Sequence, residues 1–314
     1  MRIYLASGFR YMGHYNLEEN LKKWGLHNRM YSYYYVKTRK AYNQTFNEIL
    51  KNTLFENILV DSGAFSISTV GGEIPIIEYA DWLSGIKDKV SYINLDVIPK
   101  DIADLERTAD MGWENLKYLE SRGLKPIPVY RLSEPKKWLE RIMDNYEYFC
   151  LSKTSVAQAG KKNILLSLDQ CWKKLTDRQG KPLRKVHGLA LTSIPLMSRY
   201  PWFSVDSSTW GRTGVFGHIM FPQKLSHGRE ASHGIVAVSE HSLGQRVKFS
   251  HYLTLSDEER RIIDDYLNSL GLNIELVSTD TDARDEVNVK YFLDLEKKLT
   301  SERGKCENLI MGFF

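Results

Sequence analysis

Eight short apolar runs that alternate with amphipathic stretches constrain the fold of this chain most strongly. Each run has the length of a β-strand, is rich in β-branched or aromatic residues, and is bounded by turn residues. The runs are 2–7 (RIYLAS), 29–36 (RMYSYYYV), 57–62 (NILVDS), 91–97 (SYINLDV), 125–130 (KPIPVY), 146–152 (YEYFCLS), 187–193 (HGLALTS) and 202–208 (WFSVDSS). Strands that alternate with helices pair in parallel, and eight such units close a barrel of about 250 residues. The sequence therefore predicts an α/β fold, a (β/α)8 TIM barrel; a doubly wound open sheet is the alternative.

Four stretches between the runs show the helical spacing of apolar residues. Their apolar faces consist of Leu17 and Leu21; Phe46, Ile49, Leu50 and Leu54; Trp138, Leu139 and Ile142; and Ile164, Leu165, Leu168, Cys171, Trp172 and Leu175. Ser133 is the predicted N-cap of the third helix. A stunted helix is expected at 194–201 (IPLMSRYP), before the last run.

The sequence changes character after residue 215. The glycine- and histidine-rich segment 211–234 predicts extended loops. A capping box from Ser256 to Glu259 begins a helix that Gly271 ends, and a second helix is expected at 282–299. Neither helix can bury its apolar face alone, so we expect 216–314 to form a C-terminal loop-and-helix appendage packed on a barrel of residues 1–215.

Charge and cysteine usage limit the environment of the protein. The net charge of +4 permits an anionic partner such as nucleic acid without requiring one. The three cysteines are far apart and odd in number, which argues for a reducing compartment. The N-terminus is a poor signal peptide, and no stretch approaches the roughly 18 apolar residues of a membrane span. We expect a cytoplasmic protein with no membrane partner.

Three of the apolar runs carry an aspartate near their ends: Asp61, Asp96 and Asp206. Singly, each would be interpreted as a cap on the following helix. In a barrel, however, the carboxyl ends of all strands meet at the same mouth. A carboxylate cluster there suits either a metal ion or an acid/base and nucleophile pair that acts on a sugar carbon.

The segments around these aspartates resemble the tRNA-guanine transglycosylases over about residues 1–215. Residues 60–66 (VDSGAFS) resemble the family's Asp-Ser-Gly-Gly-Phe/Tyr-Gln signature, and 94–99 (NLDVIP) occupy the place of its strand with a base-reading aspartate. Residues 187–212 resemble its glycine-rich strand, short helix and final strand with the nucleophile. The Asp-Ser-Ser-Thr-Trp ending at 206–210 is closer to the DpdA-type branch, the phage and bacterial enzymes that place 7-deazaguanines in DNA.

The resemblance implies a base exchange through a covalent intermediate. Asp206 would attack C1′ of a guanosine-type nucleotide, and Asp61 would assist proton transfer as one base leaves and another enters. Asp96 would accept hydrogen bonds from the N1–H and 2-amino edge of the base. Phe65 would supply an aromatic face, and Leu189 would close the opposite side of the base.

The turn after Asp61 is also part of the implied base site. The resemblance places Ser62 and Gly63 there, and we expect Gly63 to let the backbone approach the base without an intervening Cβ. Ala64 and Ser66 stand where the family has its second glycine and its glutamine.

The fifth run departs from the family, because the usual base-binding glutamine is absent. The chain offers Tyr130 and Arg131 there, and Arg131 is expected to contact a phosphate or the O6 of the base. Arg212 and the basic segments 37–40, 173–185 and 223–229 are candidates for contacts with a nucleic-acid backbone. A target in duplex DNA must leave the base stack, for which residues 8–15 or the aromatic-rich tail are candidate wedges.

No metal and no cofactor are predicted. The family's zinc motif, Cys-x-Cys-x-x-Cys with a distant histidine, does not follow Asp206, and the tail histidines fit no structural zinc spacing. Those histidines are His218, His227, His233, His241 and His251. The expected partners are DNA, with tRNA less favoured, and a free 7-deazaguanine such as preQ0; a homodimer is compatible with the resemblance. A phage-encoded protein would act in the host cytoplasm.

Three alternatives to a DNA-guanine transglycosylase remain at this point. A tRNA-guanine transglycosylase would use the same chemistry on another polymer. A nucleoside or glycoside hydrolase would use Asp206 and Asp61 with water as the acceptor. A non-catalytic nucleic-acid-binding barrel would need none of the three aspartates.

Overall fold

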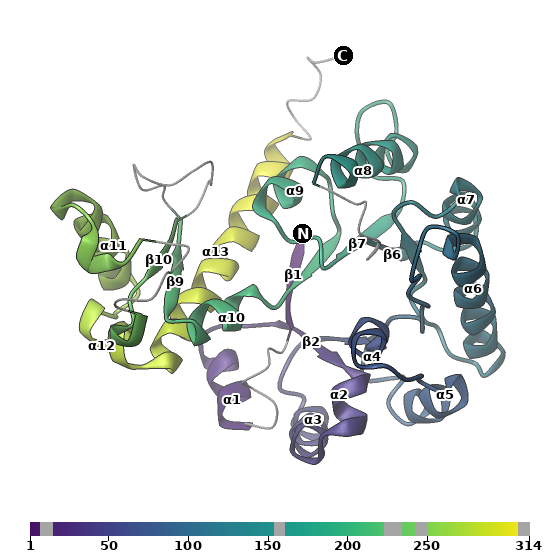
Figure 1. The fold of residues 1–314 in the computed structure, drawn as a ribbon, viewed down its shortest axis with the longest axis horizontal. Coiled ribbons are helices and arrows are strands. Elements are labelled where there is room, and N and C mark those ends of the chain that lie inside the picture. Colours follow the sequence, from purple (N-terminus) through teal and green to yellow (C-terminus); the bar gives the residue numbers. More distant parts are fainter. Residues whose placement is uncertain (7–14, 154–160, 223–233, 243–249, 307–314) are drawn as a thin grey trace. The chain divides into compact units, whose positions relative to one another are not determined.

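The computed structural model of this chain describes residues 1–6, 15–153, 161–222, 234–242 and 250–306 (Figure 1). Contacts divide the chain into two units. The first consists of Met1–Ala6, His27–Ser207 and Leu299–Phe314, and the second of Ser7–Leu26 and Ser208–Lys298. The predicted division into 1–215 and 216–314 places Ser7–Leu26 with the strands, whereas its contacts group it with the second unit.

Eight parallel strands form one curled sheet in the first unit (Figure 1). They are β1 (Arg2–Ala6), β2 (Asn28–Ser32), β3 (Asn57–Asp61), β4 (Ser91–Tyr92), β5 (Val129–Arg131), β6 (Tyr148–Ser152), β7 (Lys185–Leu189) and β8 (Ser204–Ser207). Their order is β4-β3-β2-β1-β8-β7-β6-β5, and every neighbouring pair is parallel. A parallel bridge between Ile93 and Ile127 joins the segments next to β4 and β5. This sheet is consistent with a TIM-like α/β barrel.

Helices flank the sheet, and Figure 1 shows α3, α5, α6, α7 and α8 around the outside of the strands. The helices of this unit are α2 (Tyr33–Thr38), α3 (Lys40–Asn52), α4 (Ala64–Val70), α5 (Ile76–Ser84), α6 (Leu105–Ser121), α7 (Lys136–Asn145), α8 (Lys161–Leu175) and α9 (Ile194–Arg199). The stripes predicted for α3 and α7 are largely buried, and α9 is short as expected. In α8, Leu165 of the predicted face is exposed.

The second predicted strand is half wrong, because 33–36 belongs to α2 rather than to a strand. Isolated propensity favours a strand for a run of tyrosines. In the structure, Tyr33 packs on the rings of Tyr79 and Trp82 in α5, with ring centroids 4.9 and 4.8 Å away. Tertiary aromatic contacts therefore override the local preference.

The predicted N-cap of α7 is also wrong. Ser133 has φ 86°, in the left-handed region, and α7 begins after Pro135. The unusual backbone of Ser133 lies in a tight turn in which Glu134 N–H donates to the Arg131 carbonyl over 3.0 Å. This turn brings the Glu134 carboxylate back to the Arg131 N–H, 3.1 Å away.

The inside of the curled sheet is apolar below its carboxyl ends. Tyr4, Met30, Leu59, Ile93, Ile127 and Cys150 form one buried cluster, with Ala6, Val129, Tyr148 and Leu189 packed against it. These residues come from β1 to β7 or from segments next to those strands. Successive side chains of a strand point to opposite faces, so the cluster identifies which residues of each strand face inward.

The second unit contains a small sheet that the sequence did not predict. β9 (His218–Phe221) and β10 (Gly234–Ala237) pair antiparallel within the stretch expected to be extended loops. The unit also contains α1 (Tyr15–Lys23), α10 (Thr209–Val215), α11 (Asp257–Ser269), α12 (Ile274–Thr279), the larger part of α13 (Thr281–Cys306) and two 3-10 turns, η1 (Glu240–Ser242) and η2 (Tyr252–Thr254).

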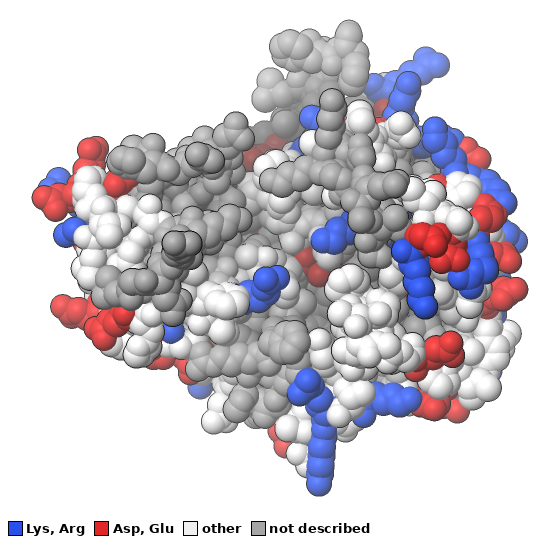
Figure 2. All heavy atoms as spheres, in the orientation of Figure 1, with Lys and Arg blue, Asp and Glu red and all other residues white. Residues whose placement is uncertain are grey.

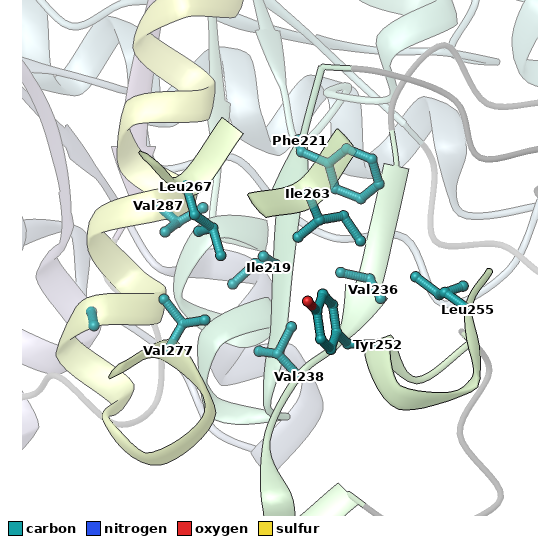
Figure 3. Packing of buried hydrophobic residues seen from close by; sticks show 11 residues of the cluster. Ile219, Phe221, Val236, Val238, Tyr252, Leu255, Ile263, Leu267, Val277 and Val287 are labelled. Atoms are coloured by element: carbon teal, nitrogen blue, oxygen red, sulfur yellow. The ribbon is translucent and has the colours of Figure 1, made fainter. Parts of the chain in front are cut away.

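The second unit has its own apolar core (Figure 3). Side chains of β9, β10, α11, α12 and α13 point toward one another there, among them Phe221, Val236, Ile263 and Val287. The core explains why the two tail helices form: each buries its apolar stripe against the small sheet. Among the described residues, no helix is long and apolar enough to cross a membrane.

The capping box that begins α11 is confirmed. Ser256 Oγ accepts from Glu259 N–H over 3.3 Å, and Glu259 Oε2 accepts from Ser256 N–H over 3.2 Å. Ser256→Ala leaves an N-terminal N–H group without its partner. We expect a loss of about 1 kcal/mol in the free energy of unfolding, measured by urea denaturation.

Ser269→Ala is the matched control at the other end of α11. The Ser269 hydroxyl donates to the Tyr266 carbonyl at an exposed position, so its removal should change stability by less than about 0.5 kcal/mol. Equal effects of the two substitutions would contradict the capping role of Ser256.

Candidate active site

The carboxyl ends of the strands place charged side chains above the apolar interior of the sheet. Leu59 belongs to the inward cluster, so Asp61, two residues further along β3, faces inward as well. By the same alternation, Val129 places Arg131 inward at the end of β5. Asp206 joins the same interior from β8, because it accepts a hydrogen bond from Ala190 N–H directly after β7.

The carboxylate of Asp61 lies within electrostatic reach of the other two aspartates. Loss of water raises the pKa of Asp61 to about 7, with further contributions from Asp96 and then Asp206. The Gly63 N–H, 3.0 Å from Asp61 Oδ2, and Arg131 lower the pKa only partly. Three aspartates far apart in the sequence therefore share one electrostatic environment, as the convergence of strand ends predicted.

Two asparagine side chains hold the segment that carries Asp96. Asn94 Nδ2 donates to the Gly112 carbonyl and Asn115 Nδ2 donates to the Leu95 carbonyl, each over 2.8 Å. These two hydrogen bonds link the irregular segment after β4 to α6. Asp96 is consequently held at the mouth of the sheet although β4 itself is only two residues long.

Asp96 and Arg131 form a buried ion pair. Their side chains are 9% and 5% exposed, and the Arg131 guanidinium donates to Asp96 Oδ2. Arg131 also donates to the Lys153 carbonyl over 3.4 Å, whereas its Nε has no hydrogen-bond partner among the described residues. The pair places hydrogen-bond donors and acceptors side by side in a buried position.

Glu134 is a buried acid that the sequence analysis missed. Burial raises its pKa to about 8, and the negative charge of Asp96 adds to this effect, while Arg131 opposes it. No spacing rule signals this residue, because only the left-handed turn at Ser133 brings its carboxylate back to Arg131.

Two donors contact the same oxygen of Asp206. Ala190 N–H donates to Oδ1 over 2.8 Å, and His187 Nε2 lies 3.3 Å from that atom. Ala190 has φ 55°, a left-handed conformation that costs a non-glycine residue about 1 kcal/mol. Such strain persists where the surrounding structure fixes the backbone, and it is common at functional sites.

His187 was also missed, although the sequence contained a signal for it. The residue lies two positions before Leu189, which was a predicted site residue on the same strand. Period-two alternation places both side chains on one face. A histidine inside an apolar run, on the same face as a predicted site residue, was therefore a signal in the sequence.

The other predicted base-site residues differ in burial and in their contacts. Tyr130 points to the opposite face of β5 from Arg131, and its hydroxyl donates to the Glu134 carbonyl over 2.8 Å. Phe65 is 62% exposed on α4. Ser62 is fully buried, and its Oγ accepts from Ala64 N–H over 3.4 Å, which engages it locally. Leu189 does face inward.

The neighbours of Gly63 within the chain already require a glycine at this position. It has φ 83°, and a Cβ at this position would come within 2.4 Å of Tyr34 Cβ and 2.9 Å of Ser32 Oγ. Ser32 at the end of β2 and Tyr34 in α2 thus occupy the space that a side chain at this position would need. Glycine is needed so that the turn after Asp61 packs under α2.

The remaining candidates lie in the second unit or outside the described residues. Arg212 is exposed on α10 of the second unit. His227, His233, residues 8–14 and the basic segment 223–229 lie outside the described residues. Within the described part of the chain, no three or more histidine, cysteine, aspartate or glutamate side chains are grouped to hold a metal ion.

Charges of opposite sign are mixed on the visible face over α6 and α7 (Figure 2). Several basic side chains there and nearby are paired within the chain: Lys137 with Glu106, Lys37 with Glu78, and Lys174 with Glu140. Two of the segments proposed to follow phosphates, 37–40 and 173–185, therefore each contain a lysine that already has an acidic partner.

Comparison with known proteins yields no assignment. No protein-family model matches the chain, and no curated protein matches it significantly.

The buried ion pair makes a prediction about stability. Asp96→Ala leaves the Arg131 guanidinium buried without its carboxylate, so we expect a loss of about 3–5 kcal/mol in the free energy of unfolding. Asp96→Ala combined with Arg131→Met should recover most of the loss, measured by urea denaturation.

A surface pair provides the control for this cycle. Asp81 accepts from Arg122 over 2.7 Å with both side chains exposed, so Asp81→Ala should cost less than about 1 kcal/mol. Additive effects of Asp96→Ala and Arg131→Met would show that the two side chains are not coupled.

The raised pKa of Asp61 predicts a pH dependence of stability. The folded protein keeps Asp61 protonated up to about pH 7, whereas the unfolded chain ionises it near about pH 4. The folded state therefore binds the additional proton in this window, and its stability falls as the pH rises. Relative to Asp61→Asn, the wild type should lose on the order of 2–4 kcal/mol between pH 4 and 8.

Urea denaturation at several pH values measures this difference. A constant difference between wild type and Asp61→Asn across the window would mean that Asp61 has an ordinary pKa in the folded state.

Proposed function

We propose that this protein is a DNA-guanine transglycosylase, which exchanges guanine in DNA for a 7-deazaguanine base, built on a closed (β/α)8 barrel. The observation that carries the proposal is the grouping of Asp61, Asp96 and Asp206, with Asp61 able to hold or release a proton near neutral pH. An acid/base group of this kind beside an ionised carboxylate suits displacement at a sugar carbon. The choice of base and polymer rests on the family resemblance.

In the first step, the Asp206 carboxylate attacks C1′ of the target deoxyguanosine. The C1′–N9 bond breaks, its electron pair goes to the departing guanine, and protonated Asp61 supplies the proton. A covalent glycosyl ester of Asp206 and an ionised Asp61 remain. A carboxylate nucleophile divides one slow displacement into two easier ones.

In the second step, the incoming 7-deazaguanine occupies the place of guanine. Asp61 accepts its N9 proton, N9 attacks C1′, and the electron pair of the ester bond returns to Asp206. Asp61 is protonated again, and the two inversions give net retention at C1′. A pKa of about 7 allows the same group to act as acid and then as base.

The ion pair of Asp96 and Arg131 supplies base recognition. Asp96 accepts from the N1–H and 2-amino groups of guanine, and the guanidinium of Arg131 donates to O6. In the absence of a base, the two side chains satisfy each other. A base with the opposite donor pattern would leave both buried charges without matching partners, which supports strong discrimination.

The contact with DNA requires that the target nucleotide leaves the base stack. Leu189, at the inward end of β7, is positioned for an apolar contact with the base. Phe65 is exposed next to the turn after Asp61 and supplies an aromatic surface for stacking. The net charge of +4 favours an anionic polymer.

The test is nucleoside mass spectrometry of DNA and tRNA from cells that express the protein and receive preQ0. We expect a 7-deazaguanine deoxynucleoside in DNA with the wild type and none with Asp206→Ala, together with loss of a denaturation-resistant protein–DNA adduct. Asp169→Asn is the matched control, because this exposed carboxylate pairs with Arg199 on the outer helices and should leave incorporation unchanged.

The same experiment separates the other functions. Modification of tRNA alone would identify a tRNA-guanine transglycosylase. Release of free guanine without incorporation would indicate a hydrolase. Normal incorporation by Asp206→Ala would exclude Asp206 as the nucleophile.

A further inference from the structure

We propose that His187 is a positioning residue for Asp206, oriented by Ser204 and Tyr148, and that it leaves Oδ2 of Asp206 as the attacking oxygen. The inference rests on the proposed function in so far as it concerns the attack. The hydrogen-bonded arrangement itself can be tested without any substrate.

The imidazole of His187 is enclosed by the sheet. It is 0% exposed, and it lies in register with Ser204 of β8 on one side and with Cys150 of β6 on the other. The ring of Tyr4 meets it edge to face, with centroids 6.0 Å apart. A buried imidazole must have partners for both nitrogens, because an unpaired buried polar atom costs about 1–3 kcal/mol.

Both ring nitrogens of His187 have partners. Nε2 lies 3.3 Å from Asp206 Oδ1, and Nδ1 lies 2.8 Å from Ser204 Oγ. Ser204 Oγ in turn lies 2.8 Å from the hydroxyl of Tyr148. The four side chains form one chain of contacts that leads from the interior of the sheet to the proposed nucleophile.

The groups at the two ends of this series of hydrogen bonds determine which atom donates in each bond. An ionised carboxylate only accepts, so Nε2 must carry the hydrogen that faces Asp206. For a neutral imidazole, Nδ1 then accepts from Ser204 O–H. Burial raises the pKa of the Tyr148 phenol, so Tyr148 keeps its proton and donates to Ser204. Each hydroxyl and ring N–H in the chain is then used once.

This arrangement distinguishes the two oxygens of Asp206. Oδ1 receives both His187 Nε2–H and Ala190 N–H. The donors hold the plane of the carboxylate and stabilise charge on Oδ1. Oδ2 is consequently the oxygen directed to C1′, and Oδ1 becomes the carbonyl oxygen of the glycosyl ester.

A neutral donor suits both steps of the reaction. It fixes the carboxylate without cancelling its charge, so Asp206 remains a nucleophile. When the ester bond breaks in the second step, the donors already face the oxygen that regains negative charge, as preorganised dipoles do at other active sites. His187 would therefore affect turnover more than binding of the free base.

The first test uses the ligand-free protein labelled with 15N-histidine, with the His187 signals identified from a His187→Phe sample. We expect NMR to show a neutral ring with the hydrogen on Nε2. In Ser204→Ala, the Nδ1 signal should shift downfield because its hydroxyl donor is lost. A hydrogen on Nδ1, a cationic ring, or an Nδ1 signal unchanged in Ser204→Ala would overturn the arrangement.

The second test measures base exchange with purified protein, DNA and labelled 7-deazaguanine. His187→Phe keeps a ring without hydrogen bonds, and we expect kcat to fall about 100-fold while KM for the free base changes less than about threefold. His187→Gln should recover at least about tenfold of this loss, because its amide can donate to Oδ1. An unchanged kcat in His187→Phe, or no recovery in His187→Gln, would overturn the positioning role.

Tyr146→Phe is the matched control. Tyr146 lies two residues before Tyr148, but its hydroxyl donates to Glu120 on α6 over 2.6 Å, so kcat should be unchanged. The two tests also separate the proposals. If the wild type exchanges no base, the proposed function fails, while the NMR result still decides whether His187 and Ser204 hold Asp206.

Discussion

Loss of water around three neighbouring carboxylates, to which their mutual repulsion adds, is the constraint on which this site depends. Like charges that lose water cannot all stay ionised at neutral pH. The structure resolves the conflict in two ways: Asp96 is paired with the buried Arg131, and the pKa of Asp61 rises to about 7. Asp206 instead accepts from the Ala190 N–H and lies against His187 Nε2. One environment thus gives the three carboxylates three different sets of partners, and the proposed reaction assigns a different role to each.

The sheet supports this arrangement because its apolar interior lies directly beneath the charged side chains. The inward cluster around Tyr4, Leu59 and Cys150 excludes water below the site, and this exclusion strengthens each interaction above it. The polar chain behind Asp206 passes through the same interior and is satisfied internally. The left-handed Ala190 lies directly after the end of β7. The site is therefore built from loop geometry on a regular parallel scaffold, as in other α/β folds of this kind.

Much of the fold followed from local pattern, and the errors have identifiable physical causes. All eight apolar runs contain strands, because a period-two or continuous apolar pattern reports burial directly. The second half of the second run was predicted as a strand but is helical, because Tyr33 packs on aromatic rings of α5. Gly63 was singled out for contact with a base, and the structure shows that Tyr34 also excludes a side chain there. Tyr130 and Arg131 were both candidates, and the alternation along β5 places only Arg131 on the same face as Val129.

The sequence by itself determined the strand and helix alternation and the positions of three aspartates near strand ends, because both depend on residues close together in the chain. Only the tertiary structure decided which carboxylate holds a proton, which is paired, and which receives His187. Those properties depend on side chains from different strands and on the water that their packing removes. Charge state is a property of the assembled interior, since Coulomb interaction and desolvation act across space. The spacing of residues in the sequence does not encode how far apart their side chains lie in the folded protein.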